Sequence, residues 1–230
     1  MATTTTNFGW DIPQSTDLVK DGATAIAALG QDIDTAFVDF KGGTTGQVLK
    51  KTSGTDLDVE WGTASSGLTL INTTSFSAVS SQDITGIFSA TYTQYRVICN
   101  IIGGTTSTEL RGRFLSGTNT PYTGADHRMQ TFSAKSSTLS GTRFTGDTQF
   151  YNICEVSSDN ESLIVMEFLN PFQSVKKSIL TSTAMEASTT GIGLRITAHG
   201  TPNTTAFTGF RFLPVASTIA GSVSVYGYNL

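Results

Sequence analysis

A series of short strand-like segments runs through residues 68–230 and leaves the chain few possible folds. The segments are rich in β-branched and aromatic residues, and Gly, Pro, Asn and Asp mark the turns between them. No ten-residue stretch of this region has the 3.6-residue periodicity of an amphipathic helix. Strands at this spacing are typical of antiparallel sheets rather than of βαβ units. The sequence therefore predicts a C-terminal antiparallel β-sandwich or jelly-roll-like domain at 68–230.

Residues 18–40 give the chain's only good helix signal. Apolar or small residues recur there at alternating spacings of three and four, which are the core positions of a coiled coil: Val19, Gly22, Ile26, Leu29, Ile33, Ala36 and Phe40. The region around the helix offers little apolar material, so we expect self-association through Ile26, Leu29, Ile33 and Phe40. The alternative is an ordinary amphipathic helix packed on its own domain. The pattern of Ile and Leu at the core positions by itself favours a coiled coil of two helices, and it does not indicate one of three helices.

Two further segments at the N-terminal end also need neighbours. Residues 1–17 are predicted to form an extended arm that places Phe8, Trp10 and Ile12 on one side, and these side chains require cover from the rest of the molecule or from a partner. Residues 43–62 are predicted to form a hairpin with strands at Gln47–Lys51 and Leu57–Trp61, followed by a linker. A lone hairpin is only marginally stable in water. The predicted organisation is an arm and oligomerisation helix at 1–42, a hairpin shaft and linker at 43–67, and the β domain.

Charge and composition exclude several classes of protein. Only 14% of residues are charged, and residues 63–230 carry ten basic and nine acidic side chains, so neither part of the chain is basic enough for nucleic-acid binding. No apolar run approaches the length of a membrane span, and the first residues do not resemble a secretory signal. Cys99 and Cys154 lie in apolar strand-like runs and are expected to be buried thiols rather than a bridge.

The sequence offers no recognisable catalytic or metal-binding set. His127 and His199 are the only histidines, and no G-x-S-x-G nucleophile motif or phosphate-binding loop is present. The acidic run at 56–60 begins like a calcium loop but lacks its glycine and final glutamate. We therefore expect no enzyme activity, metal or cofactor. Two long polar loops, which contain Tyr122 and Asn203, are candidates for receptor contact, with plain solvated turns as the alternative.

Several patches together resemble a known family. Phe8–Pro13, Thr16–Gly22 and Ala27–Asp34 are similar to the N-terminal module of tailed-bacteriophage tail fibres and minor tail proteins, of the kind found in marine and cyanobacterial phages. The 46–61 hairpin resembles an element of phage fibre shafts. The endings of such fibres are similar to Phe210–Pro214 and Gly221–Tyr228.

The resemblance implies a structural virion protein of the phage tail that forms a homotrimer. The N-terminus, with Phe8, Trp10 and Ile12, would dock on a tail or baseplate protein, and the C-terminal β domain would contact a host surface receptor such as a polysaccharide. Two alternatives remain open at this point. One is a purely architectural tail or baseplate component without receptor contact, and the other is a glycan-degrading tail spike, for which we find no supporting residues.

Overall fold

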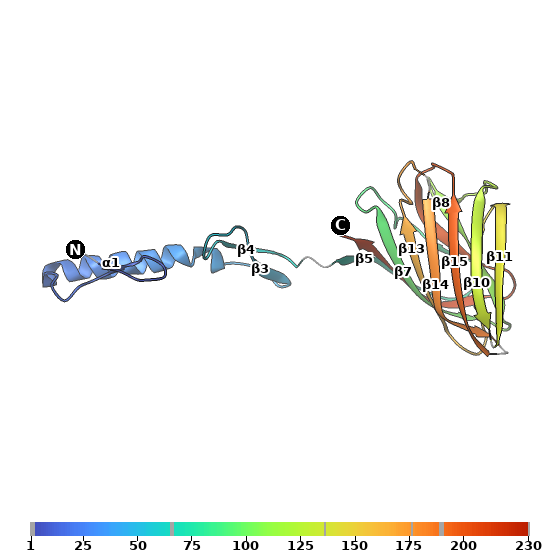
Figure 1. Cartoon of the computed structure of the whole chain (residues 1–230), viewed down its shortest axis with the longest axis horizontal. Coiled ribbons are helices and arrows are strands. Elements are labelled where there is room, and N and C mark those ends of the chain that lie inside the picture. The colour runs from blue at the N-terminus through green and yellow to red at the C-terminus, as the bar shows by residue number, and fades with distance from the viewer. Residues whose placement is uncertain (1–2, 65–66, 136, 176, 189–190, 230) are drawn as a thin grey trace. The chain divides into compact units, whose positions relative to one another are not determined.

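The computed structural model describes residues 3–64, 67–135, 137–175, 177–188 and 191–229. The chain divides into two compact units, Met1–Ser65 and Ser66–Leu230, which are drawn together in Figure 1. The segments that we predicted separately at 1–42 and 43–67 thus fall mainly into one unit. The predicted linker lies partly outside the described residues, at 65–66.

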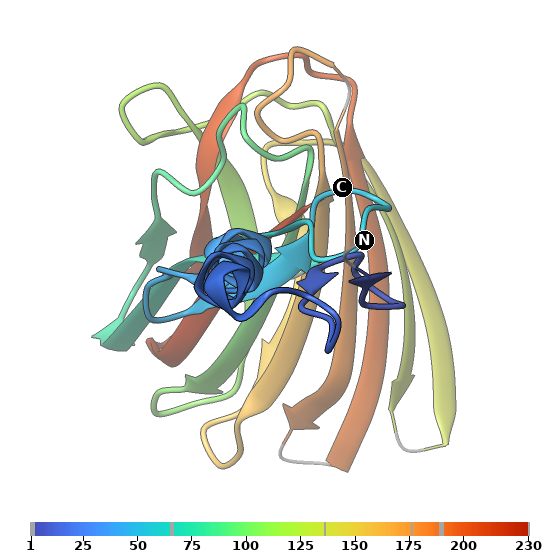
Figure 2. The same ribbon diagram turned by 90° about the vertical axis from the view of Figure 1, so that its left-hand side faces the viewer.

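The first unit contains a helix flanked by two small hairpins. Its elements are β1 (Thr3–Thr4), β2 (Asp11–Ile12), α1 (Val19–Ala36), the 3-10 helix η1 (Val38–Phe40), β3 (Gln47–Lys51) and β4 (Val59–Thr63). The prediction of an extended arm is wrong, because β1 pairs with β2 in a tight antiparallel hairpin. Gly9, with a φ of +70°, allows the chain to reverse there. The hairpin lies along one side of α1, which Figure 2 shows end-on.

None of the described residues of this unit is buried. Along α1, the arm half-covers Gly22, Leu29 and Ala36, whereas Val19, Ile26 and Ile33 are 97%, 65% and 40% exposed. The helix therefore presents one flank of its apolar seam to the arm and leaves the other flank in solvent.

The second hairpin packs against the end of the helical segment. Leu49 of β3 lies opposite Trp61 of β4. The Trp61 indole Nε1 donates a hydrogen bond to the carbonyl oxygen of Phe40 at 3.4 Å. Gly43 lies against the same indole ring so closely that a Cβ atom would overlap it. These contacts pack the β3–β4 hairpin against η1, so the helical segment and the hairpin belong to the same unit.

The second unit consists of antiparallel sheets, which confirms the prediction of a mainly β protein. Within the described residues, the larger sheet has the strand order β11-β10-β15-β14-β13-β7-β17-β5 and the smaller has the order β12-β8-β16-β6, with β9 paired to β8. The strands of the larger sheet are, in that order, Thr138–Asp147, His127–Lys135, Gly191–Thr201, Lys177–Ser188, Ser162–Leu169, Gln94–Gly103, Ile219–Tyr228 and Leu68–Val79. Those of the smaller are Phe150–Val156, Thr108–Ser116, Phe207–Pro214 and Gln82–Ile84, and β9 is Thr120–Pro121.

Side chains from both sheets meet in one hydrophobic core. Burial alternates along β7 and β13, so that every second residue points inward. Phenylalanines dominate the contact, and the rings of Phe114 on β8 and Phe207 on β16 are stacked with centroids 4.2 Å apart. Tyr95 is fully buried, and its hydroxyl donates to the carbonyl oxygen of Ser89 at 3.0 Å. The inward face thus fixes the strand register, and polar groups are left for the outer faces and loops.

No helix among the described residues is long and apolar enough to cross a membrane.

Candidate functional site

The structure brings together the two loops that the sequence singled out. Tyr122 lies in the loop between β8 and β10, and Asn203 lies in the loop after β15. The Asn203 side-chain Nδ2 donates to the Tyr122 hydroxyl at 2.5 Å, and that hydroxyl donates to Asp126 Oδ2 at 2.9 Å. Burial and the bond to Asp126 both raise the pKa of Tyr122, so the hydroxyl keeps its proton. The two loops therefore form one hydrogen-bonded cluster, which we call the loop cluster.

A buried lysine, Lys177, donates a hydrogen bond to the Asn203 loop of this cluster. Lys177, at the start of β14, is 2% exposed, and its Nζ donates to the carbonyl oxygens of Gln173 and Val175 at 2.7 and 2.6 Å. It also reaches the carbonyl oxygen of Asn203 at 3.4 Å. Desolvation lowers the pKa of Lys177. Because a buried ammonium group needs such partners, Lys177 holds the Asn203 loop in place.

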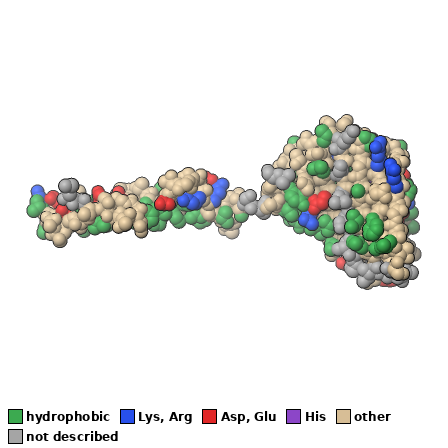
Figure 3. Space-filling model, in the orientation of Figure 1, with side chains coloured by type: hydrophobic (Ala, Val, Ile, Leu, Met, Phe, Trp, Pro, Cys, Tyr) green, Lys and Arg blue, Asp and Glu red, His purple; other side chains and the backbone are tan. Residues whose placement is uncertain are grey.

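An open pocket of about 560 Å³ lies beside the loop cluster. Its wall includes Asp126 and Pro202 from the loops and Arg128, Arg143 and Thr145 from β10 and β11. Arg128 lies opposite Thr145, and Gln130 lies opposite Arg143, so the two arginines are diagonal neighbours on the outer face of the sheet. Figure 3 shows basic side chains gathered over this end of β10 and β11.

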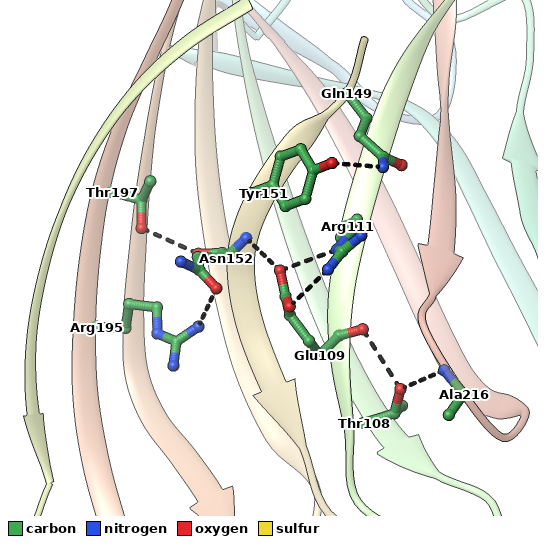
Figure 4. A network of polar contacts seen from close by, with 9 residues as sticks. All are labelled: Thr108, Glu109, Arg111, Gln149, Tyr151, Asn152, Arg195, Thr197 and Ala216. Carbon is green, nitrogen blue, oxygen red and sulfur yellow. Dashed lines mark hydrogen bonds and ion pairs between the residues drawn. The ribbon is translucent and has the colours of Figure 1, made fainter. Parts of the chain in front are cut away.

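A second polar network, drawn in Figure 4, joins the two sheets. Glu109 on β8 accepts two hydrogen bonds from Arg111, at 3.0 and 3.1 Å, and a third from the backbone nitrogen of Asn152 on β12 at 3.0 Å. The Asn152 amide oxygen accepts from Arg195 on β15 at 3.4 Å, and its carbonyl oxygen accepts from Thr197 at 3.0 Å. A polar pocket of about 290 Å³ opens here.

Glu109 of this network lies directly opposite a second carboxylate, that of Glu155. A glycosidase requires such a pair of carboxyl groups. Glu155 on β12 is the cross-strand partner of Glu109. Glu155, however, accepts from Lys135 at 2.9 Å, as Glu109 accepts from Arg111. A glycosidase needs one of its two carboxyl groups to hold a proton, and each of these faces a cation instead. We assign this network a structural role, which is to tie the edge of the smaller sheet to β10 and β15.

The histidines and cysteines lie inside the second unit. His127 and His199 are both buried, and neither Nε2 atom has a hydrogen-bond partner in the structure. Neither Cys99 nor Cys154 is in a disulfide bridge, and both are buried. Burial raises the pKa of the Cys99 thiol. Among the described residues, no group of three or more His, Cys, Asp or Glu side chains could hold a metal ion.

The predicted docking residues form a compact aromatic cluster rather than an open row. The Phe8 and Trp10 rings stack with their centroids 4.9 Å apart. The centroid of the Trp10 ring also lies 6.2 Å from that of the Phe37 ring. Phe8 remains 46% exposed, while Trp10 and Ile12 are half-buried against the helix side of the unit. Of the three predicted docking residues, Phe8 therefore offers the largest exposed surface to a partner.

Arg128, Arg143 and Lys177 are the residues of the loop-cluster region that sequence reasoning missed. The alternation of strand β10 could have placed Arg128 on an outer face. The partner strand β11 carries no strong apolar alternation, so the neighbouring position of Arg143 had no signal in the sequence.

Searches against protein-family models, curated proteins and solved structures found no match for this chain.

Proposed function

We propose that the chain is a structural virion protein, a short bacteriophage tail fibre that acts as a homotrimer. The single observation that supports this most strongly is the complete lack of buried residues in 3–64. A unit of this size without a core cannot be stable alone, because burial of apolar area is the main favourable term in folding. Contact with other copies supplies the missing burial.

The exposed side chains of α1 favour copies of the same helix as the partner. Val19, Ile26 and Ile33 of α1 are spaced by seven residues and exposed, and Phe40 of η1 is also exposed and follows at the same sequence spacing. A seven-residue repeat is the pattern of helices that wind around each other. Burying each of the large side chains would contribute about 1.5–3 kcal/mol. The arm half-covers the second row, which includes Leu29, so it would flank the bundle rather than fill its centre.

For the second unit we propose a β-sandwich of the jelly-roll kind that contacts the host surface. The loop cluster supports this role because it is polar, bonded by Lys177 and joined across two loops. Tyr122 and Asn203 are the proposed contact residues. Phe8 is the proposed contact with a tail or baseplate protein. The purely architectural alternative gives the loop cluster no role. In the glycan-degrading alternative the two facing carboxylates, Glu109 and Glu155, are each paired with a cation.

The mass of the intact chain in solution tests the assembly. Sedimentation equilibrium at micromolar concentration should give three times the 24.3 kDa chain mass. A dimer would retain the helix seam and refute the trimer. A monomer would contradict the proposal as a whole.

Location in the virion tests the biological role. Antibodies against residues 68–230 should label the free end of the tail in electron micrographs of the phage whose genome encodes this chain. Label on the capsid, or absence of the chain from purified particles, would contradict a tail fibre. Label buried within the baseplate would favour the architectural alternative.

A further inference from the structure

The side chains of Arg128 and Arg143 form a pair of cations without a direct carboxylate partner among the described residues. Neither guanidinium group makes a hydrogen bond or ion pair with a described residue, although both line the pocket beside the loop cluster. They are diagonal neighbours on β10 and β11, at a separation that long side chains can bridge. Like charges at this separation repel, so the pair costs stability in the free protein.

Three other arginines of the second unit pair with carboxylates. Arg96 pairs with Glu167 at 3.5 Å, Arg111 with Glu109 at 3.0 Å, and Arg211 with Asp83. Only 14% of the residues are charged, so crowding does not force two cations together. The arginines at the pocket thus differ from these three guanidinium groups, whereas the Nε atom of Arg113 also lacks a hydrogen-bond partner.

The lining of the pocket contains both polar and apolar residues besides the two arginines. Asp126 accepts the Tyr122 hydroxyl on Oδ2 while its Oδ1 has no hydrogen-bond partner, and no ion pair joins this carboxylate to either arginine. Ala125 and Pro202 supply small apolar surfaces, and Thr145 adds a hydroxyl. The volume of about 560 Å³ is that of a small-molecule site.

We propose that this pocket binds the anionic group of an acidic sugar, with Arg128 and Arg143 holding a carboxylate or phosphate between them. Guanidinium groups match the planar geometry of both anions and bind them with charge-assisted hydrogen bonds. The Tyr122–Asn203 edge of the loop cluster would then lie beside the sugar hydroxyls. The inference deepens the receptor contact proposed above and depends on that proposal for the source of the ligand.

Titration calorimetry of the full chain at low salt tests the site with three probes. They are an oligosaccharide of glucuronic acid, glucose 6-phosphate and a neutral glucose oligosaccharide. We expect one or both anionic probes to bind and the neutral probe not to bind. Arg128→Gln and Arg143→Gln should each weaken binding at least fivefold, and 0.5 M salt should weaken it further because exposed charges are screened. Arg96→Gln is the matched control, since it removes a cation from the same sheet outside the pocket, and it should leave binding unchanged.

Each outcome decides the chemistry of the site. Binding of the glucuronate probe alone identifies a carboxylate site, and binding of the phosphate probe alone identifies a phosphate site. Equal binding of the neutral probe, unchanged binding in both arginine variants, or no binding of either anionic probe would overturn the proposal. If the chain proves to be monomeric but still binds the anionic probes, the anion site is supported and the tail-fibre proposal fails.

Discussion

Lowering the pH from 7.5 to 5 is expected to reduce the stability of the second unit by about 4 kcal/mol, because two buried histidines resist protonation. Burial lowers the pKa of His127 to about 4 and that of His199 to about 3. Their ordinary value, which applies to the unfolded chain, is 6.5. Each side chain contributes about 2 kcal/mol of this change at pH 5.

The geometry explains these shifts. His127 is packed edge-on against Phe150, with ring centroids 4.9 Å apart, and His199 lies 5.6 Å from the same ring. Both ring nitrogens of His199 lack hydrogen-bond partners. Asp126 and Asp147 raise the pKa of His127 and Arg113 lowers it, but desolvation outweighs all three. A proton on either ring would thus place an unpaired charge in the core.

The direction in which stability changes with pH follows from the number of protons that the folded and unfolded chains bind. Between pH 6.5 and pH 4 the unfolded chain binds protons on both histidines, while the folded chain binds few. Stability is therefore complete above pH 6.5 and declines as the pH falls below it. A loss of about 4 kcal/mol is a large part of the 5–15 kcal/mol that holds an ordinary domain together.

Denaturant unfolding at pH 7.5, 6.5, 5.5 and 5 measures this loss. All six tyrosines lie in the second unit and both tryptophans lie in the first, so tyrosine near-ultraviolet circular dichroism and tryptophan fluorescence report the two units separately. The tyrosine transition should shift with pH in the wild type. His199→Leu, which removes two unpartnered nitrogens, should halve the pH dependence.

The double variant His127→Phe with His199→Leu is the internal control. The chain has no other histidine, so this variant should be nearly insensitive to pH between 7.5 and 5.5. A wild-type tyrosine transition that stays constant over this range would show that the two rings are hydrated in the folded state. A double variant as pH-sensitive as the wild type would assign the effect to other groups.

How far the sequence predicted the fold depends on the type of signal. The helix was predicted at 18–40 and is found at Val19–Ala36 with η1 after it, because the heptad spacing is strong and two glycines follow. The hairpin strand Gln47–Lys51 was predicted with the observed bounds. The second hairpin strand was expected at 57–61 and lies at Val59–Thr63, since Leu57 takes a positive φ of 61° in the turn.

Two features gave misleading or no local signal. The alternation of Phe8, Trp10 and Ile12 predicted an extended arm, but a turn at Gly9 lets Phe8 and Trp10 stack on each other. Strand β11 gives no strand signal in the sequence because it lies at the edge of the sheet, where neither face is well buried and apolar alternation is not required. Since Arg143 lies on β11, the arginine pair could be recognised only from the pairing of β10 with β11. The loop cluster also required tertiary structure, because Tyr122 and Asn203 are far apart in sequence.

The second large effect is expected from Ile33→Asp, which should dissociate the assembly that we propose. Ile33 is 40% exposed on the stripe that also contains Ile26 and Phe40. In a bundle of identical helices the substitution would place one carboxylate per chain at the shared axis. An unpaired charge removed from water costs several kcal/mol, in addition to the lost burial of the isoleucine. Because every copy carries the change, the penalty is repeated in each chain, and we expect a shift from trimer to monomer at micromolar concentration.

Gln31→Asp is the matched control, because it introduces the same side chain on the opposite side of α1, where residue 31 is exposed. Sedimentation equilibrium should give the trimer mass for this control and the single-chain mass for Ile33→Asp. Tryptophan fluorescence should shift to longer wavelength only in Ile33→Asp, since the first unit loses its packing, while the tyrosine signal of the second unit remains. An Ile33→Asp chain that stays assembled with unchanged tryptophan fluorescence would show that the stripe is not the contact between copies. Dissociation of both variants would instead indicate a general sensitivity of the helix to negative charge, so the position of the seam is decided by the difference between them.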